Sequence, residues 1–155
     1  MIRSFTHEDK DYIINSHYEL YNKEYNYDLS FRNFIEGKVE DIIKKTYDNE
    51  NTWILEIERA KRGSISIRNV SDKVAQLGLF LVEPATRGTG YGTQLVENAI
   101  AFCKERGYQT VILWTNSDHT SARNIYKKQG FQLKQTKIKT LSNKELSEEK
   151  WELSV

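Results

Sequence analysis

Three glycines within a short segment mark the part of the chain best suited to chemistry. The run Arg87-Gly88-Thr89-Gly90-Tyr91-Gly92 lies between a strongly apolar strand pattern and an amphipathic helix pattern. Glycines let successive backbone N–H groups converge without obstruction, and a helix start adds unpaired donors and partial positive charge. Arg87 can add a charge-assisted contact to phosphate. The segment therefore predicts an anion cradle, with a glycine-rich turn that binds nothing as the alternative.

Spacing argues against two nucleotide-binding loops. A Walker loop requires Gly-x-x-x-x-Gly-Lys-Ser/Thr, and no Lys follows these glycines. A dinucleotide fingerprint requires Gly-x-Gly-x-x-Gly, whereas this segment has Gly88-x-Gly90-x-Gly92. The following strand also ends in Thr115-Asn116 where that fold places an acidic residue. Both nucleotide readings are therefore disfavoured.

The elements around the glycines predict a mixed sheet with helices on its faces. Thr6 and Asp9 form a cap pattern before a helix of about 18 residues, and a second helix begins at Ser30. Three β-rich runs then predict an antiparallel meander, whose last run is apolar enough for a central strand. The expected elements are strand 1–5, two helices, strands 53–57, 64–67 and 75–82, helix 91–106, strand 110–114, helix 121–129, and strands 131–138 and 151–155.

This order predicts an α/β (α+β) fold with one domain spanning residues 1–155. A formal charge of +1 gives no field for nucleic acid or an anionic membrane. Neither a signal-like start nor a run of about 18 apolar residues occurs, so we expect a cytoplasmic protein. Cys103 falls on an apolar helix face, and His7, His17 and His119 are scattered, so we expect no metal site.

Two motifs resemble those of the GNAT superfamily of acetyl-CoA-dependent N-acetyltransferases. Residues 82–92 are similar to its pyrophosphate loop, with Arg87, Gly90 and Gly92 at the characteristic positions. The segment Asn124-Ile125-Tyr126-Lys127-Lys128-Gln129-Gly130-Phe131 resembles its Asn-x-x-Tyr…Gly-Phe segment and follows at the usual distance. A narrower resemblance, to the acetyltransferase unit of MarR-fused GNAT proteins, lies in Leu113-Trp114-Thr115, Ser121-Ala122-Arg123 and Trp151-Glu152-Leu153.

The resemblance implies acetyl-CoA as co-substrate and no metal. It implies that the glycine loop holds the pyrophosphate, that the strand before it pairs with the pantetheine arm, and that Tyr126 protonates the CoA thiolate. A phenol, with an ordinary pKa near 10, stays protonated until a thiolate of pKa near 8.5 forms. The residues expected to contact acetyl-CoA are Phe80, Leu81, Val82, Arg87, Gly88, Thr89, Gly90, Tyr91, Gly92, Thr93 and Asn124.

The acceptor half of the reaction is less defined. Tyr21, Glu24 and Tyr25 on the first helix could bind a cationic amine, together with a loop expected at residues 139–150. The acceptor is expected to be a small-molecule or peptide amine, and the protein a monomer or homodimer. Gln76 stands where some GNAT relatives carry a Glu, so the sequence assigns no general base.

Glu24, Glu56 and Glu58 remain candidates for that base, each equally compatible with a solvated surface position. A non-catalytic acyl-CoA sensor is the alternative function.

Overall fold

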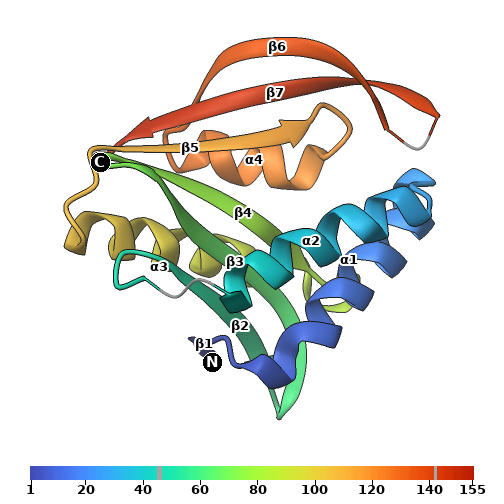
Figure 1. The fold of residues 1–155 in the computed structure, drawn as a ribbon, viewed down its shortest axis with the longest axis horizontal. Coiled ribbons are helices and arrows are strands. Elements are labelled where there is room, and N and C mark those ends of the chain that lie inside the picture. The colour runs from blue at the N-terminus through green and yellow to red at the C-terminus, as the bar shows by residue number, and fades with distance from the viewer. Residues whose placement is uncertain (45–46, 142) are drawn as a thin grey trace.

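A single mixed sheet organises residues 1–44, 47–141 and 143–155, the part of the chain that the computed structural model describes. Its seven strands follow the order β1-β2-β3-β4-β5-β7-β6 (Figure 1). The elements are β1 Ile2–Ser4, α1 Lys10–Tyr25, α2 Leu29–Lys44, β2 Asn51–Ile57, β3 Ala60–Ser71, β4 Val74–Val82, α3 Tyr91–Glu105, β5 Thr110–Asn116, α4 Thr120–Lys128, β6 Gln132–Leu141 and β7 Lys144–Ser154. This is the predicted element order, and the antiparallel meander β2-β3-β4 is confirmed.

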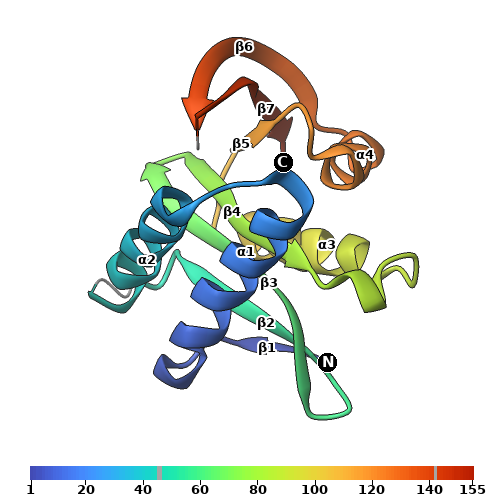
Figure 2. The ribbon, with the colours of Figure 1, turned by 90° about the vertical axis from the view of Figure 1, so that its right-hand side faces the viewer.

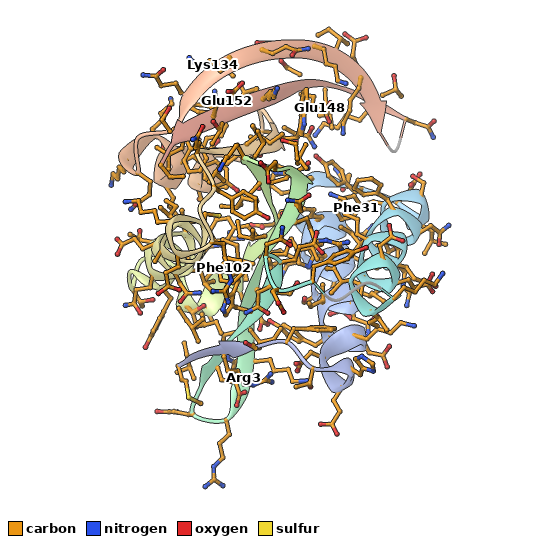
Figure 3. The ribbon with its side chains drawn as sticks, turned by 60° about the vertical axis from the view of Figure 1, so that its left-hand side comes forward. Arg3, Phe31, Phe102, Lys134, Glu148 and Glu152 are labelled. Carbon is orange, nitrogen blue, oxygen red and sulfur yellow. The ribbon has the colours of Figure 1, made fainter. Side chains whose placement is uncertain are left out.

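The sheet separates two hydrophobic cores. Alternation along β2 sends Ile54 towards α1 and α2, whereas Trp53 and Leu55 pack with the side chains of α3. Phe31 on α2 and Phe102 on α3 lie on opposite sides of the central strands (Figure 3). Figure 2 views the molecule from the side of the two N-terminal helices and shows α1 in front of the central strands. None of the helices in the described ranges is both long and apolar enough to cross a membrane.

A β-bulge in β4 opens the sheet. Ser66 pairs with Gly78, but Ser64 pairs with Leu81, so β4 carries one extra residue at this point. Leu79 adopts a φ of 47°, a conformation that costs a non-glycine residue free energy. The Ser64 hydroxyl donates to the Leu79 carbonyl at 2.7 Å and satisfies that buried oxygen.

The bulge determines where β4 and β5 part. The two strands run parallel and pair only from Val74 to Gln76, opposite Thr110 to Ile112, within the described residues. From Gly78 onward, the β5-facing edge of β4 is therefore free of strand partners. A free strand edge is suited to an extended ligand that pairs with the backbone.

The predicted loop at residues 139–150 is wrong, because β6 and β7 continue through it as a long hairpin. Lys139 pairs with Leu146, and Lys137 pairs with Glu148. The Lys139 ammonium lies 2.6 Å and the Lys137 ammonium 3.3 Å from Glu148 carboxylate oxygens. Cross-strand ion pairs replace the apolar alternation by which strands are recognised in sequence, so this segment resembled a loop.

The predicted cap at Thr6 and Asp9 is confirmed, and it is part of a larger charge cluster. The Asp9 carboxylate is only 1% exposed and accepts hydrogen bonds from the Arg3 guanidinium at 2.8 and 2.9 Å and from the Thr6 backbone N–H at 2.8 Å. The Lys61 ammonium lies 2.8 Å away. The hydrogen bond from Arg3, above all, holds the pKa of Asp9 far below its usual range.

Asp9→Asn is expected to lower the free energy of unfolding at pH 7 by about 3 kcal/mol, because it removes the buried carboxylate that pairs with the half-buried Arg3 and Lys61 and leaves Arg3 with Glu56 alone. A depressed folded-state pKa contributes stability above the ordinary Asp pKa of about 4 and loses it as pH falls below that value. Urea unfolding should therefore show that the difference in free energy of unfolding between wild type and Asp9→Asn is smaller at about pH 3 than at about pH 5. A gap independent of pH, or an equal loss in the exposed control Asp11→Asn, would contradict this account.

Candidate active site

Two adjoining cavities lie where β4 and β5 separate. The first, of about 260 Å³, is bounded by α1, the end of β4, the glycine loop and α4. The second, of about 400 Å³, is bounded by α1, α2, β4, β5 and the β6–β7 hairpin. Tyr21, Phe80, His119 and Ala122 line both cavities. Ligands bound in the two cavities could therefore meet beside Phe80.

The glycine loop has the geometry of an anion cradle. Gly88 and Gly90 have φ values of 78° and 87°, in the left-handed region that favours glycine. No backbone acceptor in the described part of the chain takes the N–H groups of residues 88–93, whereas the Gln94 N–H donates to Gly90 O at 3.0 Å. These free donors stand at the start of α3, a helix of 15 residues whose N-terminus attracts negative charge. The loop thus fits a pyrophosphate.

Most residues predicted to contact acetyl-CoA surround the first cavity. Those that line it are Phe80, Leu81, Val82, Arg87, Gly88, Gly90, Gly92 and Thr93. Three others do not line it. The Thr89 hydroxyl donates to the Thr86 carbonyl, Tyr91 packs against the core on the α3 side, and Asn124 is exposed on α4.

Gly92 allows α3 to approach the strand edge. A Cβ atom placed there would lie 2.9 Å from Ile125 Cδ1, 3.4 Å from Val82 Cγ2 and 3.5 Å from Phe80 Cζ. The absence of a side chain therefore brings the helix start, the end of β4 and α4 together around one space. The cavity exists because this position is glycine.

Arg87 is held by a residue from α1. Its Nη1 and Nη2 atoms each lie 2.8 Å from a Glu24 carboxylate oxygen, and its Nε donates to Val82 O at 3.2 Å. The hydrogen bond from Arg87 lowers the pKa of Glu24. Glu24 lines neither cavity, whereas Tyr21 and Tyr25, also predicted for acceptor binding, line the first.

Tyr126 is one of the residues that line the second cavity. Its ring is 4% exposed, with its centroid 5.9 Å from that of Phe80 and 5.7 Å from that of Phe131. Burial raises the pKa of its phenol well above the ordinary value of 10. Tyr126 is therefore protonated at neutral pH and lies beside a residue that lines both cavities.

His119 is a site residue that sequence reasoning missed. It lines both cavities, and its ring centroid lies 4.6 Å from that of Tyr25 and 5.1 Å from that of Tyr21. Its Nε2 lies 3.2 Å from the Tyr27 hydroxyl, which accepts a hydrogen bond from the Asn116 side chain at 2.9 Å. Burial lowers the pKa of His119 to about 4, so the imidazole is neutral at pH 7. No local sequence signal links His119 to α1, because only the tertiary fold brings them together.

The candidate bases left open by the sequence are not gathered at the cavities. Glu56 pairs with Arg3, and Figure 3 shows Arg3 at the opposite end of the molecule from Glu148. Glu58 lies in the β2–β3 turn with a φ of 52°. Gln76 lines the second cavity, and Glu148 is the one carboxylate among the described residues that line either cavity. The geometry therefore assigns the base to none of the three predicted glutamates.

A phosphate cradle lies beside a free strand edge and continues into a second cavity, an arrangement suited to a phosphate-bearing ligand with an extended arm. The profile of the Acetyltransferase (GNAT) family matches residues 14–131, and the chain belongs to this family. It is 26% identical over 140 residues to an uncharacterised N-acetyltransferase from Methanocaldococcus jannaschii, a region covering 86% of this chain and 61% of that protein. It spans still smaller shares of the other curated relatives that it matches.

Solved structures share the whole fold. An N-acetyltransferase from Staphylococcus aureus Mu50 has a TM-score of 0.80 and 18% identity, with 99% of this chain and 97% of the other covered. YncA from Salmonella typhimurium, solved with its cofactor acetyl-CoA, has a TM-score of 0.76 and 14% identity, with 99% and 92% covered. These similarities confirm the predicted GNAT-like fold.

Proposed function

We propose that this chain transfers an acetyl group from acetyl-CoA to a primary amine, with Tyr126 as general acid. The observation that carries the proposal is the pair of adjoining cavities, one ending in the anion cradle and the other containing Tyr126. Acetyl-CoA supplies an activated acyl group in the form of a thioester. Family membership and the fit of the cradle to a pyrophosphate support it as the donor.

The chain's own residues have distinct roles in this proposal. Backbone N–H groups of residues 88–93 bind the pyrophosphate, and the free edge of β4 at residues 80–82 holds the pantetheine arm as an added strand. A backbone N–H on that edge polarises the thioester carbonyl. The neutral amine attacks the thioester carbonyl, and the C–S bond breaks as the amide forms. Tyr126 donates its proton to the departing sulfur, while the proton lost by the amine passes to solvent, from which the phenol is reprotonated. Asn124 contacts the pantetheine arm once it is bound.

A non-catalytic acyl-CoA sensor is the second candidate. The observation in its favour is that Gln76 provides an amide where a carboxylate could accept the amine proton. The carboxylate of Glu148 is already engaged by two lysines. Tyr126, buried in the second cavity, favours catalysis over sensing.

Thermal unfolding with acetyl-CoA, ATP or NAD, followed by CoA release with a panel of amines, tests the proposal. We expect stabilisation by acetyl-CoA alone and CoA release with at least one primary amine. Stabilisation by acetyl-CoA without turnover on any amine would favour the sensor. No stabilisation by acetyl-CoA, together with a shift caused by ATP or NAD, would reject both readings.

Glu24→Gln is expected to tighten acetyl-CoA binding, with Kd falling by up to about fivefold. The substitution removes the carboxylate that holds Arg87 and releases the guanidinium to contact phosphate. The gain is modest because an exposed ion pair contributes about 1 kcal/mol or less. Calorimetric titration measures it, with the exposed Glu19→Gln on the same helix as control. A weaker Kd would instead mean that Glu24 positions Arg87 for the ligand.

Several narrower predictions belong to the same proposal. The likeness to the acetyltransferase unit of MarR-fused proteins rests on residues 113–115, 121–123 and 151–153. We propose a single domain over residues 1–155, a cytoplasmic location and a monomer or homodimer. We further propose a small-molecule or peptide amine as acceptor, with neither metal nor nucleic acid involved.

A further inference from the structure

Lys38 is a half-buried cation in the lining of the second cavity, and it forms no ion pair with an acidic residue of the part of the chain that the structure describes. It lies on α2 and lines that cavity, and its Nζ stands 4.7 Å from the centroid of the Phe34 ring. None of the ion pairs formed within residues 1–44, 47–141 and 143–155 includes Lys38. Burial, and secondarily the charge of Lys139, lowers the pKa of its ammonium, and the smaller opposing effect of Glu148 does not offset this. A bound anion would therefore stabilise the Lys38 ammonium.

The other charges lining the cavity cancel. Lys139 lies 2.6 Å from Glu148, and the adjacent Lys137, outside the lining, lies 3.3 Å from the same carboxylate. Burial lowers the pKa values of both His17 and His119 to about 4, so both imidazoles are neutral at pH 7. Lys38 thus leaves the lining with one uncompensated positive charge. An acceptor with a single negative charge matches it better than a phosphate monoester, which carries nearly two.

Much of the wall on the side of α2 is apolar, and Trp114 of β5 extends it, whereas Ser30, Thr115 and Asn116 are polar lining residues. Phe31 and Ile35 are 5% and 4% exposed, and Phe34 and Trp114 complete this part of the lining. Such a wall accommodates a hydrocarbon or aromatic side chain. Among the described residues that line the second cavity, the one carboxylate is that of Glu148, which two lysines already engage. A second ammonium of a polyamine would therefore find no free carboxylate there.

We infer that the acceptor is a small amine that also carries a carboxylate, of the amino-acid class with an apolar side chain. In this arrangement the carboxylate of the acceptor binds Lys38, and its side chain lies against the rings of Phe31 and Phe34. The amine of the acceptor points towards Phe80 and Tyr126. This inference rests on the proposed function and adds the acceptor class to it. It replaces the expectation that Tyr21, Glu24 and Tyr25 of α1, together with residues 139–150, bind a cationic amine.

Matched acceptor pairs test the inference. The probes are L-phenylalanine against phenylethylamine and L-leucine against isopentylamine, each with saturating acetyl-CoA, with spermidine as a polyamine. The expected kcat/KM is about ten- to a hundredfold higher for the acid of each pair, as for a hydrogen bond to a charged group. Lys38→Met should raise KM for the amino acid by a similar factor, leave kcat within about threefold, and leave the simple amines unchanged.

Two variants separate charge recognition from folding. Lys38→Arg retains the cation and should preserve most of the preference, whereas Lys44→Met removes an exposed lysine of the same helix and should change nothing. Turnover of the simple amines or spermidine at least as good as that of the amino acids would overturn the inference while leaving the transferase proposal intact. An unchanged preference in Lys38→Met would also overturn it. Absence of turnover on every amine would reject the transferase proposal, and this inference with it.

Discussion

Tyr126→Phe is expected to lower kcat by about 10²- to 10⁴-fold, the usual contribution of a general acid, while the Kd of acetyl-CoA stays within about twofold. The substitution removes only the hydroxyl, and the ring contacts with Phe80 and Phe131 remain. Burial raises the pKa of the phenol, so it keeps its proton at the pH of the reaction. The same burial would raise the pKa of a thiol formed beside it, so the pKa values of the proton donor and the proton acceptor rise together. Single-turnover kinetics with acetyl-CoA measures the loss.

Two tyrosines provide matched controls. Tyr21 lines both cavities, but its hydroxyl lies 3.4 Å from the Phe80 carbonyl and donates to it, so Tyr21→Phe should reduce kcat far less. Tyr18, on the same helix, lines neither cavity, and Tyr18→Phe should leave kcat unchanged. Turnover undiminished in Tyr126→Phe would remove it from the acid role. A larger loss in Tyr21→Phe would transfer that role to Tyr21.

The sequence predicted the donor half of the site because its signals are local. The loop from Arg87 to Gly92 needs positive φ at Gly88 and Gly90 and a helix start immediately after, and each requirement is visible as a residue type at a fixed position. The strand before it is apolar because its residues alternate between buried and half-buried positions, with none exposed. Local chemistry and local structure therefore point to the same segment.

The bulge that opens the sheet could not be predicted in the same way. Its strained residue is Leu79, a type that strongly avoids positive φ. The conformation persists because the Ser64 hydroxyl, on the neighbouring strand, satisfies the Leu79 carbonyl. That partner lies 15 residues away across a hairpin, so the cause depends on the cross-strand register and not on the residues next to Leu79.

Charge pairs explain the remaining differences. Glu24 looked like an acceptor ligand because it lies on a helix face with two tyrosines, but Arg87, 63 residues later, holds it outside both cavities. The β6–β7 hairpin looked like a loop because its cross-strand pairs are Lys and Glu rather than apolar residues. The partner of Glu24 is distant in sequence, whereas Lys139 and Glu148 are 9 residues apart and their pairing becomes visible only in the strand register.

Gly92→Val is expected to weaken acetyl-CoA binding by about a hundredfold or more and to lower the free energy of unfolding by about 1–3 kcal/mol. The first added carbon would lie 2.9 Å from Ile125 Cδ1, and the two methyl groups beyond it would reach Val82, Phe80 or the cavity itself. Calorimetric titration measures the binding loss, and urea unfolding measures the stability. Gly37→Val is the matched control, because a Cβ there meets nothing within 4 Å and Gly37 lines neither cavity.

Combining Gly92→Val with Ile125→Val separates the two effects of the substitution. Removal of the Ile125 Cδ1 atom relieves the closest contact, so the double variant should recover stability relative to Gly92→Val. Binding should stay weak, because the valine methyl groups still occupy the space between β4 and α3. Recovery of acetyl-CoA affinity together with stability would show that the glycine serves packing alone. Wild-type affinity in Gly92→Val itself would mean that the pantetheine arm does not pass between Phe80 and the start of α3.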